Sequence, residues 1–382
     1  MIKNTLQTAT PDWHSKVCGK RVIVGMSGGV DSSVAAYLLK SAGAEVHGVF
    51  MKNWEEEFDT GFCTSAEDLN DAQKVADTLG IYLHKVNFAK DYKERVFSYF
   101  LDTLKAGLTP NPDVLCNKEI KFKAFLDHAH QLGADFIATG HYARTRTLDG
   151  QTQLLKGLDN NKDQSYFLHL LNQNQLSQTI FPIGELEKSA VRAIALREKL
   201  ITFDKKDSTG ICFIGERDFS EFIGKYLPSQ KGDMITPEGE IIAQHNGLAF
   251  YTIGQRKGLK IGGRKNSDGK PWFVVDKLIQ TNQLVIAQGE HKAMFGQALI
   301  ALDPHWIDPN WIDSNGVPKK SKLRAKIRYR QQDQSCTIIP QSDNSLLVNF
   351  DEPQRAITPG QSIVFYDDDT CLGGAFISIK LK

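Results

Sequence analysis

The segment Ser27-Gly28-Gly29-Val30-Asp31-Ser32-Ser33 lies between a short apolar run and a helix-like run near the start of the chain. Val22-Ile23-Val24 precedes it and predicts a buried strand, and residues 34–40 after it predict a helix. In a glycine turn of this kind, backbone N–H groups and the positive end of the helix dipole attract an anion. The segment therefore predicts an anion-binding turn between the first strand and its helix.

The residue types of this turn indicate which anion it binds. No lysine stands where the ATPase loop G-x-x-x-x-G-K-S/T requires one. The string S-G-G-x-D-S resembles the pyrophosphate loop of AMP-forming enzymes, which activate a carbonyl or carboxylate by adenylation. An ordinary Gly-Gly turn with a serine cap is the alternative interpretation. Two glycines, an acid and two hydroxyls in register between strand and helix favour nucleotide binding.

The composition of the chain limits the protein classes to consider. The 382 residues suffice for two or three domains, and 41% apolar with 24% charged residues is typical of a soluble globular protein. No apolar run reaches the roughly 20 residues that span a bilayer, and residues 1–20 lack the features of a signal peptide. We therefore expect a cytoplasmic protein without a membrane segment. The net charge of +1 requires any RNA binding to use local patches.

The order of apolar and amphipathic runs predicts an α/β fold with a parallel sheet at its N-terminal end. The expected strands are residues 21–26, 45–50, 82–87 and 135–139, and the expected helices are 31–42, 66–80, 91–105 and 118–132. Ligands bind beyond the carboxyl ends of such strands. The glycine turn, Met51 and the run Thr139-Gly140-His141 all lie at that edge.

The second half of the chain has a different character. Residues 165–203 are helical in pattern, and residues 228–290 are rich in glycine and short strand-like pieces such as 248–253 and 272–275. From about residue 295, strand-like runs recur at short spacing, at 322–329, 335–340, 345–350, 362–366 and 371–380. This pattern predicts a small all-β barrel at the C-terminal end.

Two of the six cysteines lie in basic surroundings. Cys116 lies in a proline-stiffened loop that leads into a lysine-rich helix, and Cys212 lies in a loop behind Lys205-Lys206. Helix N-termini and nearby lysines lower the pKa of a thiol, although a free cysteine is commonly just a small buried apolar residue. The remaining cysteines have apolar or featureless neighbours; they are Cys18, Cys63, Cys336 and Cys371. Without any C-x-x-C pair, the chain predicts neither a structural zinc site nor a disulfide framework.

Several segments together resemble the tRNA-specific 2-thiouridylase family. They are SGGVDSS, VFMKNW (49–54), NPDVLCNKEIKF (111–122), ATGHY (138–142), NKDQSYFL (161–168), DSTGICFIGER (207–217), GQRKGLKIGG (254–263), RAKIRYR (324–330) and TPGQS (358–362). The resemblance covers residues 21–382 without a large gap. The segments around Cys116 and Cys212 are long and specific, whereas many families share the pyrophosphate loop.

The resemblance implies an AMP-forming tRNA sulfurtransferase that thiolates the wobble uridine at position 34 of tRNAs such as those for Lys, Glu and Gln. ATP would adenylate the 2-carbonyl of the base, and a persulfide on Cys212 would supply sulfur. Cys116 would be the nucleophile that releases this sulfur, which leaves a transient Cys116–Cys212 disulfide. A thiolate is the reactive form in both roles. A cysteine desulfurase or a sulfur-relay protein would be the donor, and the family suggests a monomer.

The same resemblance assigns binding residues. ATP would contact Gly25, Met26, Ser27, Gly28, Gly29, Val30, Asp31, Ser32, Met51 and Gly140. The tRNA would contact Asn111, Pro112, Asp113, His141, Lys162, Asp163, Gln164, Arg328, Tyr329 and Gln361. Asp31 is predicted either to hold Mg²⁺ near the phosphates or to serve only as a helix-start acid. Arg324, Lys326, Arg328 and Arg330 could line one face of a strand, either as a tRNA-backbone contact or as a solvated face.

We accordingly expect three domains. Residues 1–220 would form a pyrophosphate-loop ATP-binding catalytic domain, residues 221–292 a small central tRNA-contacting domain and residues 293–382 a C-terminal β-barrel. Two other classes stay open. A different pyrophosphate-loop enzyme, such as an amidating synthetase, would not need two thiols. A non-catalytic tRNA-binding or sulfur-carrier protein would release no pyrophosphate from ATP.

Overall fold

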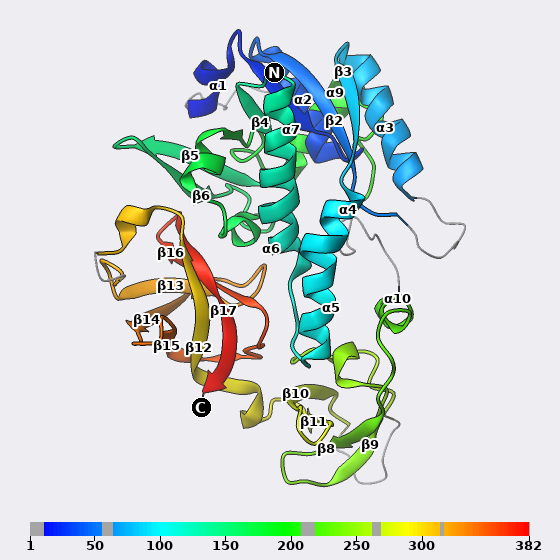
Figure 1. The fold of residues 1–382 in the computed structure, drawn as a ribbon, viewed down its shortest axis with the longest axis vertical. Coiled ribbons are helices and arrows are strands. Elements are labelled where there is room, and N and C mark those ends of the chain that lie inside the picture. Colours follow the sequence, from blue (N-terminus) through cyan, green and yellow to red (C-terminus); the bar gives the residue numbers. More distant parts are fainter. Residues whose placement is uncertain (1–10, 56–63, 208–217, 262–268, 314–316, 382) are drawn as a thin grey trace, which may run out of the picture. The chain divides into compact units, whose positions relative to one another are not determined.

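The computed structural model describes residues 11–55, 64–207, 218–261, 269–313 and 317–381. Figure 1 shows its helices and strands, labelled where there is room. The chain folds into two compact units. One contains residues 1–92, 116–209 and 369–371, and the other contains residues 93–115, 210–368 and 372–382. No helix in the described residues is long and apolar enough to cross a membrane.

The first unit is built on a parallel sheet of five strands. In sheet order these are β3 (Tyr82–Asn87), β2 (Glu45–Lys52), β1 (Arg21–Gly25), β4 (Phe136–Ala138) and β7 (Thr179–Ile180). Every neighbouring pair is parallel, and Val24 on the central strand lies opposite Gly48 and Ala138. The sheet confirms the α/β fold expected from the alternating runs. It also places the ends of β1, β2 and β4 at one edge.

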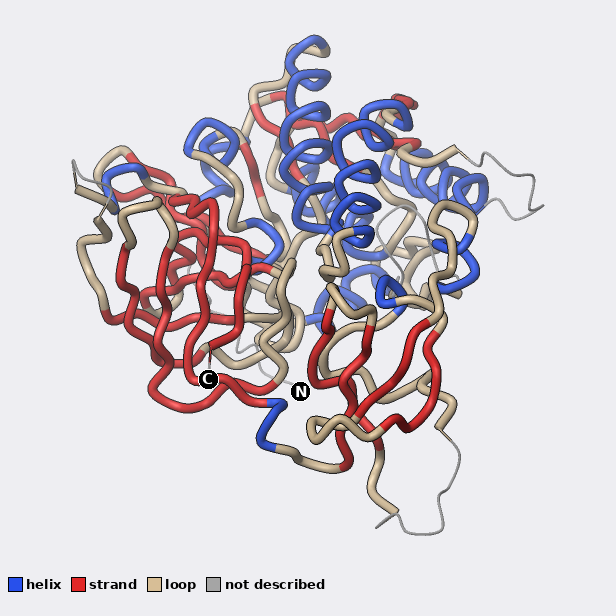
Figure 2. The backbone as a smooth tube through the Cα atoms, turned by 60° about the horizontal axis from the view of Figure 1, so that its bottom comes forward, coloured by secondary structure: helices blue, strands red, loops and turns tan. Residues whose placement is uncertain are grey.

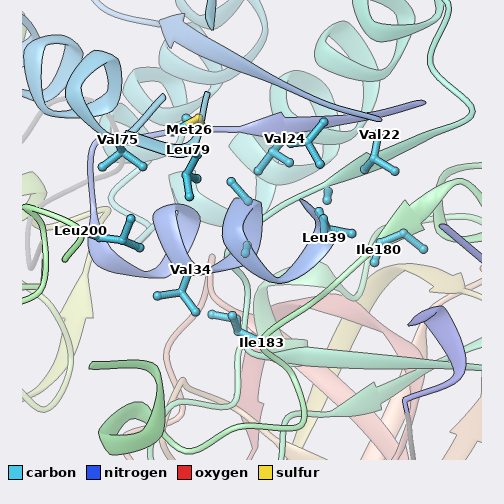
Figure 3. Packing of buried hydrophobic residues seen from close by; sticks show 14 of the residues in the cluster. Val22, Val24, Met26, Val34, Leu39, Val75, Leu79, Ile180, Ile183 and Leu200 are labelled. Atoms are coloured by element: carbon cyan, nitrogen blue, oxygen red, sulfur yellow. The ribbon is translucent and has the colours of Figure 1, made fainter. Parts of the chain in front are cut away.

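Helix α2 (Val30–Ser41) packs directly on this sheet. Ala35, Ala36 and Leu39 are fully buried, and the two alanines precede Leu39 by four and three residues, so each shares a helix face with Leu39. Figure 3 shows Val34 and Leu39 among side chains from β1, from α3 (Thr64–Leu79) and from the residues around β7. Full burial of each larger aliphatic side chain contributes about 1.5–3 kcal/mol. This core holds the start of α2 firmly next to the end of β1.

The remaining elements of the first unit lie around the sheet. They are α1 (Asp12–Val17), α4 (Ala89–Tyr92), the π-helical turn η2 (Asn117–Ala124), α7 (Phe125–Gln131), β5 (Ala143–Leu148), β6 (Gln151–Lys156), η3 (Ser165–Leu168), α8 (Gln173–Ser177) and α9 (Lys188–Arg197). Asp149 and Gly150 connect β5 to β6 and both have positive φ, as a two-residue hairpin turn requires. Thr370 and Cys371 pair with Leu155 and Leu154 of β6.

Two of the predicted helices are broken into consecutive pieces. The helix expected at 91–105 consists of α4, the π-helical turn η1 (Lys93–Phe97) and α5 (Ser98–Lys105). The helix expected at 118–132 begins six residues earlier, with α6 (Pro112–Cys116), and continues through η2 and α7. Proline at the first helical position has a suitable φ and needs no N–H partner, which explains the early start. Cys116 therefore lies on a helix, and its predicted place in a loop was wrong.

The second unit contains a four-stranded sheet in the order β10-β11-β8-β9. Its elements are α10 (Phe219–Gly224), β8 (Gly232–Ile235), β9 (Ile241–His245), η4 (Leu248–Phe250), β10 (Trp272–Leu278) and β11 (Gln283–Gln288). The prediction of a strand at 248–253 is wrong, because Leu248–Phe250 forms a short 3-10 helix. Gly247, at φ 134°, turns the chain there in a conformation that other residues avoid.

A closed six-stranded antiparallel barrel completes the second unit, and its strands are drawn in red in Figure 2. The elements are η5 (Lys292–Met294), β12 (Phe295–Trp306), η6 (Pro309–Trp311), β13 (Lys322–Lys326), β14 (Gln334–Pro340), β15 (Leu346–Arg355), β16 (Ser362–Asp367) and β17 (Thr370–Leu381). Pairing of β12 with β17 closes the barrel. Its interior is apolar and includes Leu299, Val348 and Phe365, as predicted for an all-β barrel.

Candidate functional site

The predicted pyrophosphate loop connects β1 to α2 and is held by its own hydroxyl groups. Ser32 Oγ donates to the carbonyl oxygen of Gly29 at 3.1 Å and accepts from the backbone N–H of Ser27 at 3.3 Å. Ser33 Oγ also donates to Gly29, at 2.8 Å, and accepts from Thr202. The serines thus fix the shape of the turn.

Two glycines allow neighbouring backbone to approach this turn closely. A Cβ atom at Gly28, which has φ 73°, would overlap the carbonyl oxygen of Asp68 on α3. A Cβ atom at Gly140 would lie 2.7 Å from the backbone nitrogen of Ser32. The loop after β4 therefore packs against the first turn of α2. The methyl group of Met51 would lie 3.2 Å from a Cβ atom at Gly25, so the structure brings the predicted nucleotide residues together at one edge of the sheet.

Asp31 in the first turn of α2 is engaged by two groups that the sequence did not predict. Lys188 Nζ lies 2.7 and 2.8 Å from its two carboxylate oxygens, and the hydroxyl of Tyr142 donates to Oδ1 at 2.8 Å. Burial and the negative charge of Asp31 raise the pKa of Tyr142, which keeps this phenol protonated. The described residues contain no cluster of three groups that could hold a metal ion. In this structure the Asp31 carboxylate is therefore bound by Lys188 and Tyr142.

Asp207 lies beside the same lysine. Its carboxylate is 2.7 Å from Lys188 Nζ, 2.6 Å from Lys162 Nζ and 3.1 Å from a guanidinium nitrogen of Arg192. Burial alone would raise the pKa of Asp207, but the hydrogen bonds and charges of Lys162 and Lys188 outweigh it and lower the pKa to about 2. Lys188 and Arg192 belong to α9, whose charged side chains are all basic, and no local motif in the sequence marks them.

Cys116 ends α6 and is completely buried. The next residue, Asn117, donates through its side chain to the carbonyl oxygen of Phe167 at 3.2 Å. Asn111, Pro112 and Asp113 are half-buried at the start of the same helix. Cys212 and Cys63 lie outside the described residues. Burial raises the pKa of Cys336 to about 12, and Cys371 is also buried, in agreement with their expected inertness.

The predicted tRNA residues of the first unit are integrated into its structure. His141 is buried, hydrogen-bonds to Thr139 Oγ1 at 2.7 Å, and has a pKa well below its usual value because of burial and the charge of Lys121. Asp163 accepts from two backbone N–H groups, and Gln164 Oε1 accepts from the backbone of Tyr142 at 2.9 Å. Lys162 is the member of this triplet that carries a positive charge.

In the second unit, the prediction that four basic side chains line one face of a strand is wrong. Strand β13 ends at Lys326, whose side chain is buried with its ammonium 5.0 Å from the ring centre of Tyr366, whereas Arg324 is exposed and paired with Asp333. Arg328 lies beyond the strand and donates to the carbonyl oxygen of Arg355 at 3.2 Å. The four basic side chains therefore do not share one face.

The other predicted tRNA residues of this unit, Tyr329 and Gln361, make different kinds of contact. The guanidinium of Arg330 lies 5.3 Å from the ring centre of Tyr329. Gln361 donates from its carboxamide nitrogen to the carbonyl oxygens of Thr109 and Pro110. Gln361 thus contacts the backbone directly ahead of Asn111.

The parallel sheet, with a glycine turn after its central strand, defines an α/β protein of the HUP class, and the family model described as "tRNA methyl transferase HUP domain" matches residues 20–216. A "tRNA methyl transferase PRC-barrel domain" matches residues 220–288, and an "Aminomethyltransferase beta-barrel domain" matches residues 297–377. The chain belongs to the tRNA-specific 2-thiouridylase (MnmA) family, as the resemblance indicated.

Curated relatives match nearly the whole chain. The tRNA-specific 2-thiouridylase MnmA of Psychromonas ingrahamii is 58% identical over 95% of this chain and 98% of its own length. That of Pseudomonas fluorescens strain Pf0-1 is 58% identical over 94% of this chain and 95% of its own. A solved 4-thiouridine synthetase–RNA complex with bound ATP aligns at 18% identity over 54% of this chain and 49% of that chain. The TM-score of that alignment is 0.33.

Proposed function

We propose that this protein thiolates the 2-position of the wobble uridine of tRNA, with ATP as the activating substrate. The observation that carries the proposal is the close packing of Gly140 against the first turn of α2, beside the S-G-G-V-D-S loop. Family membership supplies the tRNA substrate, because the relatives are named 2-thiouridylases. An activity on tRNA would place the protein in the cytoplasm.

The turn after β1 fits the pyrophosphate part of ATP. Backbone N–H groups at the start of α2 and the helix dipole favour phosphate oxygens there. Glycine at positions 28 and 140 allows close approach of backbone, and Gly25 and Met51 lie beside this edge of the sheet. We expect residues 25–32, Met51 and Gly140 to contact the nucleotide. Mg²⁺ would arrive with ATP, since the described residues form no cluster to hold it.

The chemistry solves a leaving-group problem. The uracil O2 attacks the α-phosphorus of ATP, pyrophosphate departs, and the C2–O bond then carries AMP as its leaving group. The terminal sulfur of a Cys212 persulfide attacks C2, and AMP leaves with the former carbonyl oxygen. The Cys116 thiolate attacks Cys212 Sγ, which breaks the S–S bond, leaves the sulfur on the base and forms the Cys116–Cys212 disulfide. A dithiol reductant returns both cysteines to thiols.

The tRNA would be held by local contacts. Lys162 supplies positive charge in the first unit, and Arg328 with Tyr329 supplies a cation and an aromatic ring in the second. Asn111, Pro112 and Asp113 at the start of α6 would address a base taken out of the anticodon stack. Asp163, Gln164 and His141 would act by shaping the surface, because their polar groups are bonded within the protein. We retain residues 1–220, 221–292 and 293–382 as the proposed domains.

A direct test is mass analysis of nucleosides from tRNA incubated with the protein, ATP, Mg²⁺, a dithiol reductant, and a cysteine desulfurase with cysteine as the persulfide donor. We expect 2-thiouridine at position 34 and one pyrophosphate for each sulfur incorporated. A tRNA whose wobble position is cytidine is the matched control, and it should gain no sulfur at that position. Pyrophosphate release without sulfur incorporation would indicate a different AMP-forming enzyme, and sulfur incorporation without ATP would contradict the adenylation step.

A further inference from the structure

Lys188 connects two carboxylates that are far apart in the sequence. Its ammonium lies 2.7 Å from Asp31, in the first turn of α2, and 2.7 Å from Asp207. The lysine side chain is only 12% exposed, and its Nζ lies 5.7 Å from the ring centre of Tyr142. In such surroundings water screens charge poorly, so each carboxylate affects how strongly the other is bound.

The two carboxylates differ in how many other cations they have. Asp207 also pairs with Lys162 and Arg192, whereas the described residues provide Asp31 with no cation besides Lys188. Release of Lys188 from Asp207 would therefore leave that carboxylate still paired. Release of Lys188 from Asp31 would leave a half-buried charge with only the Tyr142 hydroxyl. The contact between Lys188 and Asp207 is the one that can be exchanged at low cost.

A polyphosphate bound at the start of α2 adds negative charge beside Asp31. Its oxygens and Asp207 then compete for the same ammonium. Lysine presents a compact charge with three rotatable donors and can turn toward a new anion without moving its helix. Lys188 starts α9, and its backbone N–H is fixed by Asp159 at 3.0 Å, so only its side chain need adjust.

We propose that Lys188 is a positioning residue that couples nucleotide binding to Asp207, because the ATP polyphosphate and Asp207 compete for its ammonium. The inference rests on the proposed function in one respect, since it takes ATP to be the ligand of the turn. Asp207 lies five residues ahead of Cys212 in the sequence. The competition would thus link occupation of the nucleotide site to the segment that carries the sulfur.

The test is a double-mutant cycle on ATP binding, measured by calorimetry on the full chain at fixed Mg²⁺ without tRNA. Lys188→Gln should weaken ATP binding about tenfold, which corresponds to one charge-assisted contact. Asp207→Asn should tighten it about fivefold, because it removes the competitor. In the Lys188→Gln background, Asp207→Asn should have no effect. Lys188→Arg, which keeps the charge, should restore most of the affinity.

A matched control separates this coupling from a general loss of ion pairs. Lys205 also joins two carboxylates, Asp68 and Asp71, at 2.8 and 2.6 Å. In a Lys205→Gln background, Asp207→Asn should still tighten ATP binding. Thermal unfolding reports whether each variant folds. If Asp207→Asn does not fold, Asp207→Ser takes its place in the cycle.

The outcomes distinguish the two proposals. An equal effect of the Asp207 substitution with and without Lys188, or no effect in either background, would overturn the coupling while ATP-dependent thiolation by the natural chain stands. Failure of the natural chain to bind ATP would overturn the coupling and the proposed function together.

Discussion

The carboxamide nitrogen of Gln361 lies 2.9 Å from the carbonyl oxygen of Thr109 and 3.1 Å from that of Pro110. The backbone N–H of Thr109 in turn donates to Pro359 at 3.0 Å. A Cβ atom at Gly360 would lie 2.8 Å from the Thr109 carbonyl oxygen, so the two segments are in close contact. The turn before β16 therefore holds the two residues that precede Asn111.

This contact predicts that Gln361 acts by positioning the segment ahead of Asn111. Gln361→Glu removes the donor of both bonds, and about 1 kcal/mol for each of the two lost hydrogen bonds would reduce kcat for thiolation by up to about thirtyfold. The dissociation constant for tRNA, measured by filter binding, should stay within twofold. Gln244→Glu changes an exposed glutamine of the same unit to the same residue and should alter neither value. A parallel loss of tRNA affinity and its salt dependence would instead make Gln361 a direct tRNA contact.

Gly140 provides the sharpest test of the nucleotide site. In Gly140→Ala the new methyl group would lie 2.7 Å from the Ser32 nitrogen and 2.8 Å from the Asp31 carbonyl carbon, which are backbone atoms. The start of α2 must shift, and overpacking of this kind costs about 1–3 kcal/mol. We expect ATP affinity, measured by calorimetry, to fall about tenfold or more. Gly224→Ala, where no atom lies within 4 Å, should leave ATP binding unchanged.

The sequence predicted the elements whose signals are local. Val22-Ile23-Val24 and the glycine turn define a strand and the start of a helix within ten residues, and the structure has both. The ion pairs of Lys188 could not be predicted, because they join residues 157 and 19 positions away through tertiary packing. The start of α6 at Pro112 had a usable signal, since proline is favoured at the first position of a helix. Lys326 lies over the ring of Tyr366 because the two are diagonal neighbours on the paired strands β13 and β16, which charge alternation does not reveal.

Lys277 predicts a pH dependence of stability. Its ammonium donates to the carbonyl oxygen of Gly107 at 3.0 Å, and burial lowers its pKa from 10.5 to about 8. Folded protein thus loses this proton at lower pH than unfolded chain does. Between about pH 8 and 10.5 the unfolded chain binds more protons, so this group makes the free energy of unfolding rise with pH. The rise is at most about 3 kcal/mol.

Urea unfolding at pH 7.5 and pH 10 measures this contribution. Lys277→Met should remove the rise. The free energy of unfolding of the natural chain should therefore increase relative to that of the variant as the pH increases. Lys292→Met, at an exposed lysine of the same unit, should leave the rise in place. A constant difference between Lys277→Met and the natural chain at the two pH values would show that Lys277 does not titrate in this range.

Arg328 should contribute to the salt dependence of tRNA binding. The Arg328 guanidinium is paired with no carboxylate among the described residues, and its one bond is to the Arg355 carbonyl oxygen. Arg328→Ala should weaken tRNA binding and reduce the slope of log affinity against log salt by about 1, while ATP binding stays unchanged. Arg324→Ala is the matched control, because Asp333 already neutralises Arg324 at 2.7 Å. Equal slopes for the natural chain and Arg328→Ala would assign Arg328 to the solvated surface.

Substitutions of Cys212 and Cys116 should stop the reaction at different stages. Cys212→Ser should abolish thiolation, because no persulfide forms. Cys116→Ser should accept sulfur on Cys212 from a cysteine desulfurase but complete no turnover, since no thiolate is left to break the S–S bond. Peptide mass spectrometry measures the sulfur adduct, and nucleoside analysis measures the product. Cys18→Ser, at an exposed cysteine, should behave as the natural chain. Absence of the adduct in Cys116→Ser would mean that Cys116 acts before sulfur loading, and that outcome would reverse the proposed division of roles.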